Sequence, residues 1–221
     1  MQQVVMPFSL LKYNKIKAFI KENAKKSCKI IAISKNHPIS SVFEALECGV
    51  RIFGENRVQE ALSKFEILKE TNKDIELHLT GPLQTNKVKS ALKIFDVFQT
   101  LDREKLALEF SKNMNLIKDK KFFIQINTGE EKSKSGVLLN DVNDFIKFCQ
   151  KDLNLNITGL MCIPPIKDDP EEHFVILNQI AQKNKLFQLS MGMSNDYKKA
   201  VLCGATCIRV GTKIFGDRHA T

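Results

Sequence analysis

Short segments rich in β-branched residues alternate along this chain with longer segments in which apolar residues recur every three or four positions. This alternation is typical of repeated strand–helix units. It predicts eight strands, at residues 29–34, 50–53, 75–80, 96–100, 121–127, 156–162, 186–190 and 206–210. Helices are predicted at 39–48, 56–69, 84–93, 103–115, 139–151, 170–184 and 195–203. Eight strands with crossover helices favour a closed (β/α)8 barrel, a TIM barrel of the α/β class, and the alternative is an open doubly wound sheet.

The pattern predicts one domain over residues 1–221. This length is typical of one α/β barrel, and no linker, repeat or low-complexity segment interrupts the sequence. Gly49 and Gly204 follow predicted helices at the position where a left-handed residue commonly ends a helix. The Lys-rich segment 12–29 lies on an amphipathic pattern formed by Leu11, Ile16 and neighbouring apolar residues. We therefore expect an additional N-terminal helix packed against the barrel.

Composition and charge exclude several classes of protein. Hydrophobic residues make up 43% of the chain, and no apolar run is long enough to cross a bilayer. The first eleven residues lack the basic region and cleavage site of an export signal, so we expect a cytoplasmic protein. The net charge of +9 comes mainly from Lys, which supplies 29 of the 34 basic residues and is spread along the chain. Because base-edge reading prefers Arg and no nucleic-acid-binding motif is present, we expect no nucleic-acid partner. The scattered Cys residues show no zinc-binding spacing, and we expect no metal site.

Small and hydroxylated residues follow the last two predicted strands. Ser194 lies after the strand at 186–190, and Gly211 and Thr212 follow the strand at 206–210. In TIM barrels the loops after strands seven and eight commonly hold a phosphate group. Glycine lets backbone N–H groups approach an anion, and hydroxyls add further donors. The alternative for Ser194 is a helix N-cap, but the joint position of these residues predicts an anion site.

Lys35 ends the first predicted strand, so a closed barrel brings it to the same mouth as the two loops. Imine formation needs a neutral amine, which burial and a neighbouring cation favour. Arg209, on the adjacent last strand, can be that cation. The alternatives are a solvated lysine for Lys35 and a structural ion pair for Arg209. An amine and a phosphate cradle at one mouth together predict pyridoxal 5′-phosphate (PLP) as the ligand.

Six segments, in their order and spacing, resemble the YggS/PROSC family of pyridoxal-phosphate-binding homeostasis proteins. They are 32–35 (AISK), 53–60 (FGENRVQE), 78–87 (HLTGPLQTNK), 133–136 (SKSG), 189–194 (LSMGMS) and 209–216 (RVGTKIFG). The resemblance extends over nearly the whole chain. It implies a single-domain barrel similar to the N-terminal domain of alanine racemase, with PLP bound as an internal aldimine, that is, a Schiff base.

The resemblance also implies roles for individual residues. Lys35 forms the imine, Ser194, Gly211 and Thr212 bind the phosphate, Asn56, Met193 and His78 line the ring, and Arg209 approaches the pyridine nitrogen. The alternatives are an N-cap for Asn56 and a hydrogen-bonded core residue for His78. A permanent cation beside the nitrogen disfavours its protonation, which makes the ring a weaker electron sink. We therefore expect PLP binding without strong catalysis.

Two positions bear on whether a second lysine takes part in binding the aldehyde. Where many relatives have a second lysine soon after the first, this chain has Asn36, His37 and Pro38, so a role of that lysine in relaying the cofactor is not expected here. Lys134 lies in a segment that matches the family and is a candidate second acceptor for the aldehyde. Its alternative is a solvated loop lysine.

The function implied is a non-enzymatic carrier for intracellular PLP homeostasis, which delivers PLP to apo-enzymes and which we expect to be a monomer. The alternative is a PLP-dependent racemase-like enzyme, which requires two bases on opposite faces of its substrate. Racemases of this fold take the second base, a tyrosine, from a separate C-terminal domain. The only tyrosines here are Tyr13 and Tyr197, and neither lies in a segment that resembles that domain. We expect no catalytic residue, and Tyr197 is the remaining candidate for a local base.

Overall fold

The computed structural model describes residues 8–216 and contains eight parallel strands that close into a barrel in chain order. The last strand pairs with the first, so that Ile31 lies opposite Arg209. The strands are β1 Lys29–Ile33, β2 Ile52–Glu55, β3 Glu76–Leu79, β4 Val97–Leu101, β5 Lys121–Ile126, β6 Ile157–Cys162, β7 Gln188–Ser190 and β8 Cys207–Val210. The predicted (β/α)8 barrel is confirmed, and the alternative of an open sheet is wrong.

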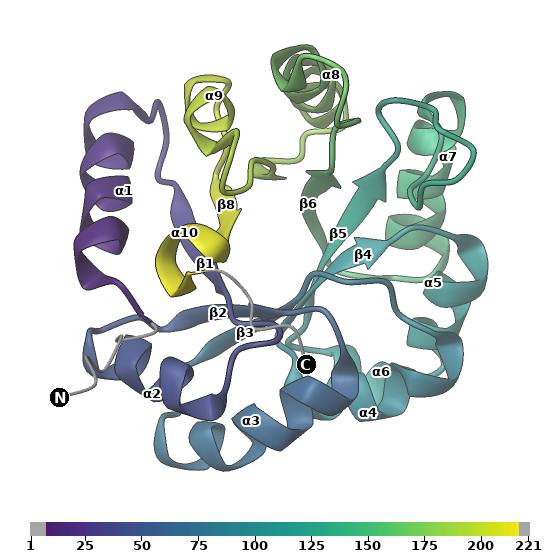
Figure 1. Cartoon of the computed structure of the whole chain (residues 1–221). Coiled ribbons are helices and arrows are strands. Elements are labelled where there is room, and N and C mark those ends of the chain that lie inside the picture. The colour runs from purple at the N-terminus through teal and green to yellow at the C-terminus, as the bar shows by residue number, and fades with distance from the viewer. Residues whose placement is uncertain (1–7, 217–221) are drawn as a thin grey trace, which may run out of the picture.

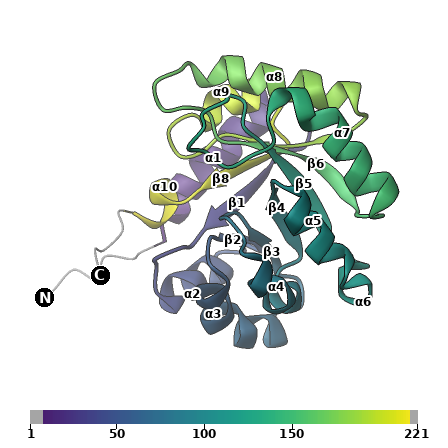
Figure 2. The ribbon, with the colours of Figure 1, turned by 90° about the vertical axis from the view of Figure 1, so that its right-hand side faces the viewer.

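Helices surround the strands as an outer ring (Figure 1). They are α1 Leu10–Asn23, α2 Ile39–Glu47, α3 Val58–Thr71, α4 Val88–Ile94, α5 Glu104–Ser111, α6 Met114–Ile117, α7 Val142–Lys147, α8 Pro170–Lys183, α9 Tyr197–Leu202 and α10 Thr212–Phe215. Two 3₁₀ turns, Thr85–Lys87 and Leu139–Asp141, precede α4 and α7, and a π-helical turn, Phe148–Asp152, follows α7. Figure 2 shows the strands running between α7, α8 and α9 on one side and α2, α3 and α4 on the other.

The core has two layers because successive side chains of a strand point to opposite faces of the sheet. The larger layer lies between strands and helices and includes the fully buried Phe53, Phe65 and Phe122. A smaller cluster fills the inside of the barrel, where Phe123 packs with apolar residues of the other strands. A barrel filled on both faces is a rigid support for the loops at its ends.

Two glycines end helices as predicted. Gly49 and Gly204 have φ of 83° and 92°, the left-handed conformation that glycine adopts without a steric penalty. The residue after each glycine returns a hydrogen bond to the helix: the Val50 N–H donates to the Ala45 carbonyl at 2.9 Å. This is the Schellman arrangement. The strand predicted to begin at residue 50 therefore begins at Ile52, because Val50 is used to close α2.

The helix predicted at 103–115 is divided into α5 and α6. The side chain of Asn113 donates a hydrogen bond to the Glu109 carbonyl at 2.9 Å, in competition with the helical backbone. Apolar spacing continues across this interruption, which is why the sequence pattern predicts one helix. The two pieces remain in contact with each other, and α6 also contacts α4.

The predicted N-terminal helix is present as α1, which packs against α9 and α10. Ile16 and Ile20 are buried in this contact, whereas Leu11, which is part of the predicted pattern, is 68% exposed. Helix α1 therefore covers the outside of the barrel near the closure between β8 and β1. None of the helices formed by residues 8–216 combines the length and the apolar character needed to span a membrane.

Candidate functional site

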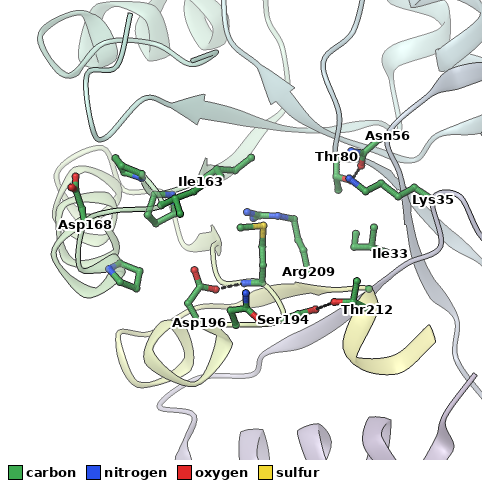
Figure 3. A pocket seen from close by; sticks show the side chains of 17 residues that line it. Ile33, Lys35, Asn56, Thr80, Ile163, Asp168, Ser194, Asp196, Arg209 and Thr212 are labelled. Atoms are coloured by element: carbon green, nitrogen blue, oxygen red, sulfur yellow. Dashed lines mark hydrogen bonds between the residues drawn. The ribbon is translucent and has the colours of Figure 1, made fainter. Parts of the chain in front are cut away.

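A cavity of about 540 Å³ opens at the carboxyl ends of the strands, a volume typical of small-molecule sites. Loops that follow β1, β2, β3, β6, β7 and β8 form its walls (Figure 3). Residues predicted for the site that line the cavity are Lys35, Asn56, Met193, Ser194, Arg209, Gly211 and Thr212. Segments from the two ends of the chain therefore meet in one cavity.

Lys35 lies two residues after the end of β1, and its side chain extends toward Asn56 and Thr80 (Figure 3). The backbone keeps the strand pairing up to this point, because the Ser34 N–H donates to the Gly54 carbonyl at 3.1 Å. The next residue, Asn36, has a φ of 61°, so the chain turns sharply after the lysine. Strand pairing on one side and a turn on the other place Lys35, half-buried, in the cavity wall.

Asn56 is held in the cavity wall by Thr80, the residue directly after β3. Its Oδ1 accepts a hydrogen bond from Thr80 Oγ1 at 2.9 Å, and the Thr80 N–H donates to the Glu55 carbonyl at 2.9 Å. The N-cap position of α3 is Arg57, so the alternative of an N-cap for Asn56 is wrong. Thr80, which has no predicted role, also lines the cavity.

The loops after β7 and β8 bring two hydroxyls together. Ser194 Oγ and Thr212 Oγ1 lie 3.2 Å apart, and the Lys213 side chain donates to the Ser194 carbonyl at 3.0 Å. The N-cap position of α9 is Asp196, so Ser194 lies outside the helix and the N-cap alternative is wrong. The hydroxyl pair lines the cavity from two separate loops, which is the arrangement expected of an anion cradle.

Gly211 completes this wall through its backbone. A Cβ at this position would lie 3.1 Å from the carbonyl oxygen of Ile33 on β1, which is tighter than ordinary van der Waals contact. Within residues 8–216, the N–H groups of Ser194, Gly211 and Thr212 donate to no protein acceptor. Backbone donors without a protein partner at a cavity wall are suited to bind the oxygens of an anion.

Arg209 projects from β8 into the cavity and is buried (Figure 3). Its Nη1 donates to Ser190 Oγ at 2.7 Å and its Nη2 donates to the Cys162 carbonyl at 2.8 Å. Burial lowers the pKa of the guanidinium, but an arginine stays protonated at neutral pH. Both partners are neutral, and no carboxylate among the described residues forms a salt bridge with it, which argues against the alternative of a structural ion pair. A buried cation with neutral partners favours an acceptor or an anion in the cavity.

A chain of hydrogen bonds continues from Arg209 through the inside of the barrel. Ser190 Oγ donates to Gln99 Oε1 at 2.6 Å, and Gln99 Nε2 lies 2.9 Å from His78 Nδ1. His78 Nε2 lies 3.0 Å from Glu76 Oε1. All four hydrogen bonds can form together if each residue donates to the next one toward Glu76, which requires that His78 carries its proton on Nε2. The chain therefore joins the cation in the cavity to a carboxylate deeper in the barrel.

The structure does not bring His78 to the cavity. Both of its ring nitrogens are used inside the barrel, by Gln99 and Glu76, and it is not among the residues that line the cavity wall. Its predicted contact with a bound ring is therefore corrected: His78 is a hydrogen-bonded core residue, the alternative considered for it. The reason is strand register, because the side chain of this β3 residue points into the barrel beneath the cavity.

Ser190→Ala is expected to lower the free energy of unfolding by about 2 to 3 kcal/mol, because it removes one hydrogen-bond partner from a buried cation and one from Gln99. Urea unfolding at neutral pH measures the loss. Ser133→Ala, in an exposed loop, is the control and should change stability by less than about 0.5 kcal/mol. Equal stabilities of the two variants would contradict the direct support of Arg209 by Ser190.

The chain of hydrogen bonds also predicts a pH dependence of stability. Burial lowers the pKa of His78, so below its ordinary pKa of 6.5 the unfolded chain binds a proton that the folded protein does not. The free energy of unfolding should therefore fall as the pH decreases below about 6.5, by at most about 1.4 kcal/mol per pH unit for this group. Urea unfolding at several pH values measures the slope. His78→Gln keeps a donor and an acceptor but cannot titrate, and a slope unchanged by this variant would contradict the assignment.

Two further positions of interest lie outside the cavity wall. Lys134 is exposed in the loop after β5 and does not line the cavity, which favours the alternative of a solvated lysine. His37 is buried, and its ring lies 5.2 Å from that of Phe215 on α10. The side chain of His37 therefore packs against α10.

The site residues without a predicted role are polar residues in the strands or directly after them. Gln99 and Ser190 are fully buried, and Thr80 lies just after β3. A signal for them exists, because a polar residue within an otherwise apolar strand is costly unless it is hydrogen-bonded. The sequence does not show which partner satisfies it.

Known proteins resemble this chain in sequence and in fold. The family model described as alanine racemase, N-terminal domain, matches residues 13–219. A pyridoxal phosphate homeostasis protein of Pasteurella multocida is 38% identical over 201 residues, which cover 86% of each chain. The protein of the same name from Aquifex aeolicus is 37% identical and covers 86% of this chain and 87% of its own.

Solved structures extend the comparison. PipY of Synechococcus elongatus, solved without PLP, has a TM-score of 0.85 at 32% identity over 94% of this chain and 99% of its own. The same protein with PLP bound has a TM-score of 0.80 at 31% identity, with the same coverage. Alanine racemase of Corynebacterium glutamicum, at 15% identity and a TM-score of 0.68, shares the fold over 93% of this chain and 60% of its own.

Proposed function

This chain belongs to the pyridoxal phosphate homeostasis proteins, within the family of the alanine racemase N-terminal domain, and on that premise we propose that it holds PLP in the cavity and delivers it to apo-enzymes. The observation that carries the proposal is the convergence of Lys35 with the Ser194 and Thr212 loops on one cavity. Its action as a monomer and in the cytoplasm stays a prediction.

The residues of the cavity fit the functional groups of PLP. When bound, PLP supplies an aldehyde that condenses with a lysine amine. Lys35 is the lysine in the cavity wall, and the paired hydroxyls of Ser194 and Thr212, with the free N–H of Gly211, would hold the phosphate. Arg209, a cation with neutral partners, would face the pyridine nitrogen. Asn56 and Met193 would line the ring.

The position of Arg209 supports binding without strong catalysis. Its guanidinium is held on two sides by Ser190 and the Cys162 carbonyl, so it cannot easily withdraw from the cavity. A fixed cation disfavours protonation of a nearby pyridine nitrogen, and an unprotonated ring withdraws electrons weakly. The protein therefore stores the reactive aldehyde rather than using it to stabilise carbanions.

The positions of the two tyrosines argue against the racemase alternative. Tyr197 is buried between α9 and α1, where its ring packs edge-on against Phe19 at 5.8 Å, and Tyr13 lies on α1. Neither tyrosine lines the cavity, so neither is placed to act as a second base. Racemisation assays with D- and L-amino acids test this point, and we expect no turnover above the rate of free PLP.

The proposal is tested by titrating the purified protein with PLP, recording the visible spectrum, and reducing the complex with borohydride. We expect an imine absorption band that borohydride removes, and a peptide containing Lys35 that carries the mass of one reduced pyridoxyl phosphate group. Labelling of Lys134 in place of Lys35, or a spectrum that PLP does not change beyond its own absorption, would refute the proposal.

A further inference from the structure

A buried cluster of charged residues lies behind the loop that carries Lys35. It consists of Glu55 at the end of β2 and of Glu60 and Lys64 on α3. Lys64 Nζ lies 2.9 Å from Glu55 Oε1 and 2.7 Å from Glu60 Oε1. The side chain of Glu55 is fully buried and that of Lys64 is 9% exposed. None of the three lines the cavity, so the roles proposed above leave this buried charge cluster unexplained.

The buried charge cluster holds the backbone on both sides of Lys35. On the N-terminal side of Lys35, Lys64 Nζ donates to the Ser34 carbonyl at 2.8 Å, and Ser34 Oγ donates to Glu55 Oε1 at 2.7 Å. On the C-terminal side of Lys35, the Asn36 N–H donates to Glu60 Oε1 at 2.5 Å. Each bond has a charged partner, which makes it stronger than a bond between neutral groups. The two neighbours of Lys35 in the chain are thus fixed to one cluster.

Stability alone gives little reason for this arrangement. A buried ion pair is often no more stabilising than apolar residues of similar volume, because both charges lose their hydration. Burial raises the pKa of Glu55, and its Oε2 has no hydrogen-bond partner among the described residues. A cluster that carries such a penalty is better explained by the geometry it imposes than by the free energy it adds.

The loop also needs to be held. Asn36 has a φ of 61°, and a left-handed conformation costs a residue with a side chain about 1 kcal/mol. Without its bond to Glu60, this residue would return more readily to ordinary conformations, and the turn that the His37 N–H closes on the Ser34 carbonyl at 3.1 Å would hold Lys35 less firmly in the cavity wall. Ordering a loop at the moment of binding lowers affinity, whereas a loop ordered in advance avoids that loss.

We propose that Glu55, Glu60 and Lys64 are positioning residues that preorganise the Lys35 loop for reaction with the aldehyde of PLP. The inference rests on the proposed function, because it takes Lys35 as the lysine that forms the imine. It extends that function by locating the control of imine formation outside the cavity. The phosphate contacts lie on the loops after β7 and β8, and Asn56, although it follows Glu55, is held by Thr80, so the cluster should affect the imine and spare the phosphate and ring contacts.

The first test compares Lys64→Met with Lys69→Met. Lys69 is a matched control, because it lies on the same helix and also contacts a carboxylate, Asp96, and a backbone carbonyl, but far from the Lys35 loop. Each variant is titrated with PLP and with 4-deoxypyridoxine 5′-phosphate, which keeps the ring and phosphate but has no aldehyde. In Lys64→Met we expect imine formation to weaken about tenfold, while binding of the analogue changes less than about twofold. In Lys69→Met neither should change.

A second pair of variants is informative even if Lys64→Met does not fold. Glu60 is partly exposed, and Glu60→Ala removes the acceptor of the Asn36 N–H whereas Glu60→Gln keeps an oxygen at that place. We expect faster hydrogen exchange of the Asn36 amide and weaker imine formation in Glu60→Ala. Glu60→Gln should restore most of the protection from hydrogen exchange and most of the imine formation, because the Asn36 N–H can again donate to a side-chain oxygen.

The outcomes separate this inference from the proposed function. If Lys64→Met and Lys69→Met weaken the imine equally, or if PLP and its analogue are affected alike, the cluster has only a structural role and the inference is overturned. The same holds if Glu60→Ala keeps the exchange rate and imine affinity of the parent. If the unaltered protein forms no imine at all, it is the proposed function that fails.

Discussion

Lys35→Ala is expected to abolish the imine absorption band and to weaken PLP binding by about a hundredfold or more, which corresponds to about 2.7 kcal/mol. The substitution removes the only lysine that lines the described cavity, and with it the covalent link to the aldehyde. The hydroxyls of Ser194 and Thr212 and the guanidinium of Arg209 remain. Absorption spectra before and after borohydride, together with equilibrium dialysis, measure both losses.

The control for this prediction is Lys134→Ala, which removes an exposed lysine from a loop outside the cavity wall. It should keep both the band and the affinity of the parent protein. Lys35→Ala should still bind 4-deoxypyridoxine 5′-phosphate as the parent does, which shows that the cavity is intact. An undiminished band in Lys35→Ala would mean that another amine reacts and that the assignment is wrong.

The sequence predicts the fold and the main elements of the cavity because both depend on local patterns. Short segments rich in β-branched residues locate the strands, and apolar residues that recur every three or four positions locate the helices. The residues at the barrel mouth then follow from the predicted end of each strand. Lys35, Ser194, Gly211 and Thr212 are found in this way, since each lies just after a strand. The errors at strand ends are small and have local causes, as at Val50, which caps α2 and so delays β2.

The sequence cannot predict partners that meet across the barrel. His78 and Gln99 lie on neighbouring strands, and their contact depends on a register that only the closed sheet determines. The same reason places His78 beneath the cavity and not in its wall. The cluster behind the Lys35 loop depends on the orientation of α3 against β2, which brings Lys64 to the Ser34 carbonyl 30 residues away. Local propensity carries no information on such contacts.

The double variant with Ser194→Ala and Thr212→Val should weaken PLP binding by about a hundredfold, with the larger part of the loss tied to the phosphate. The two hydroxyls lie 3.2 Å apart on separate loops, so one anion can accept hydrogen bonds from both. A hydrogen bond to a charged group contributes about 1.5 to 3 kcal/mol, so each single variant should lose about tenfold. Because the hydroxyls contact each other, the double variant need not show the product of the two single effects.

Pyridoxal, which has the aldehyde but lacks the phosphate, provides the matched comparison. Its imine with Lys35 should form equally in the parent protein and in the double variant, because the amine and its loop are unchanged. Inorganic phosphate should compete with PLP for the parent protein and much less for the double variant, which an absorbance competition titration measures. Equal losses for PLP and pyridoxal would show that the substitutions disturb the barrel mouth in general, and the phosphate would then have to be bound elsewhere.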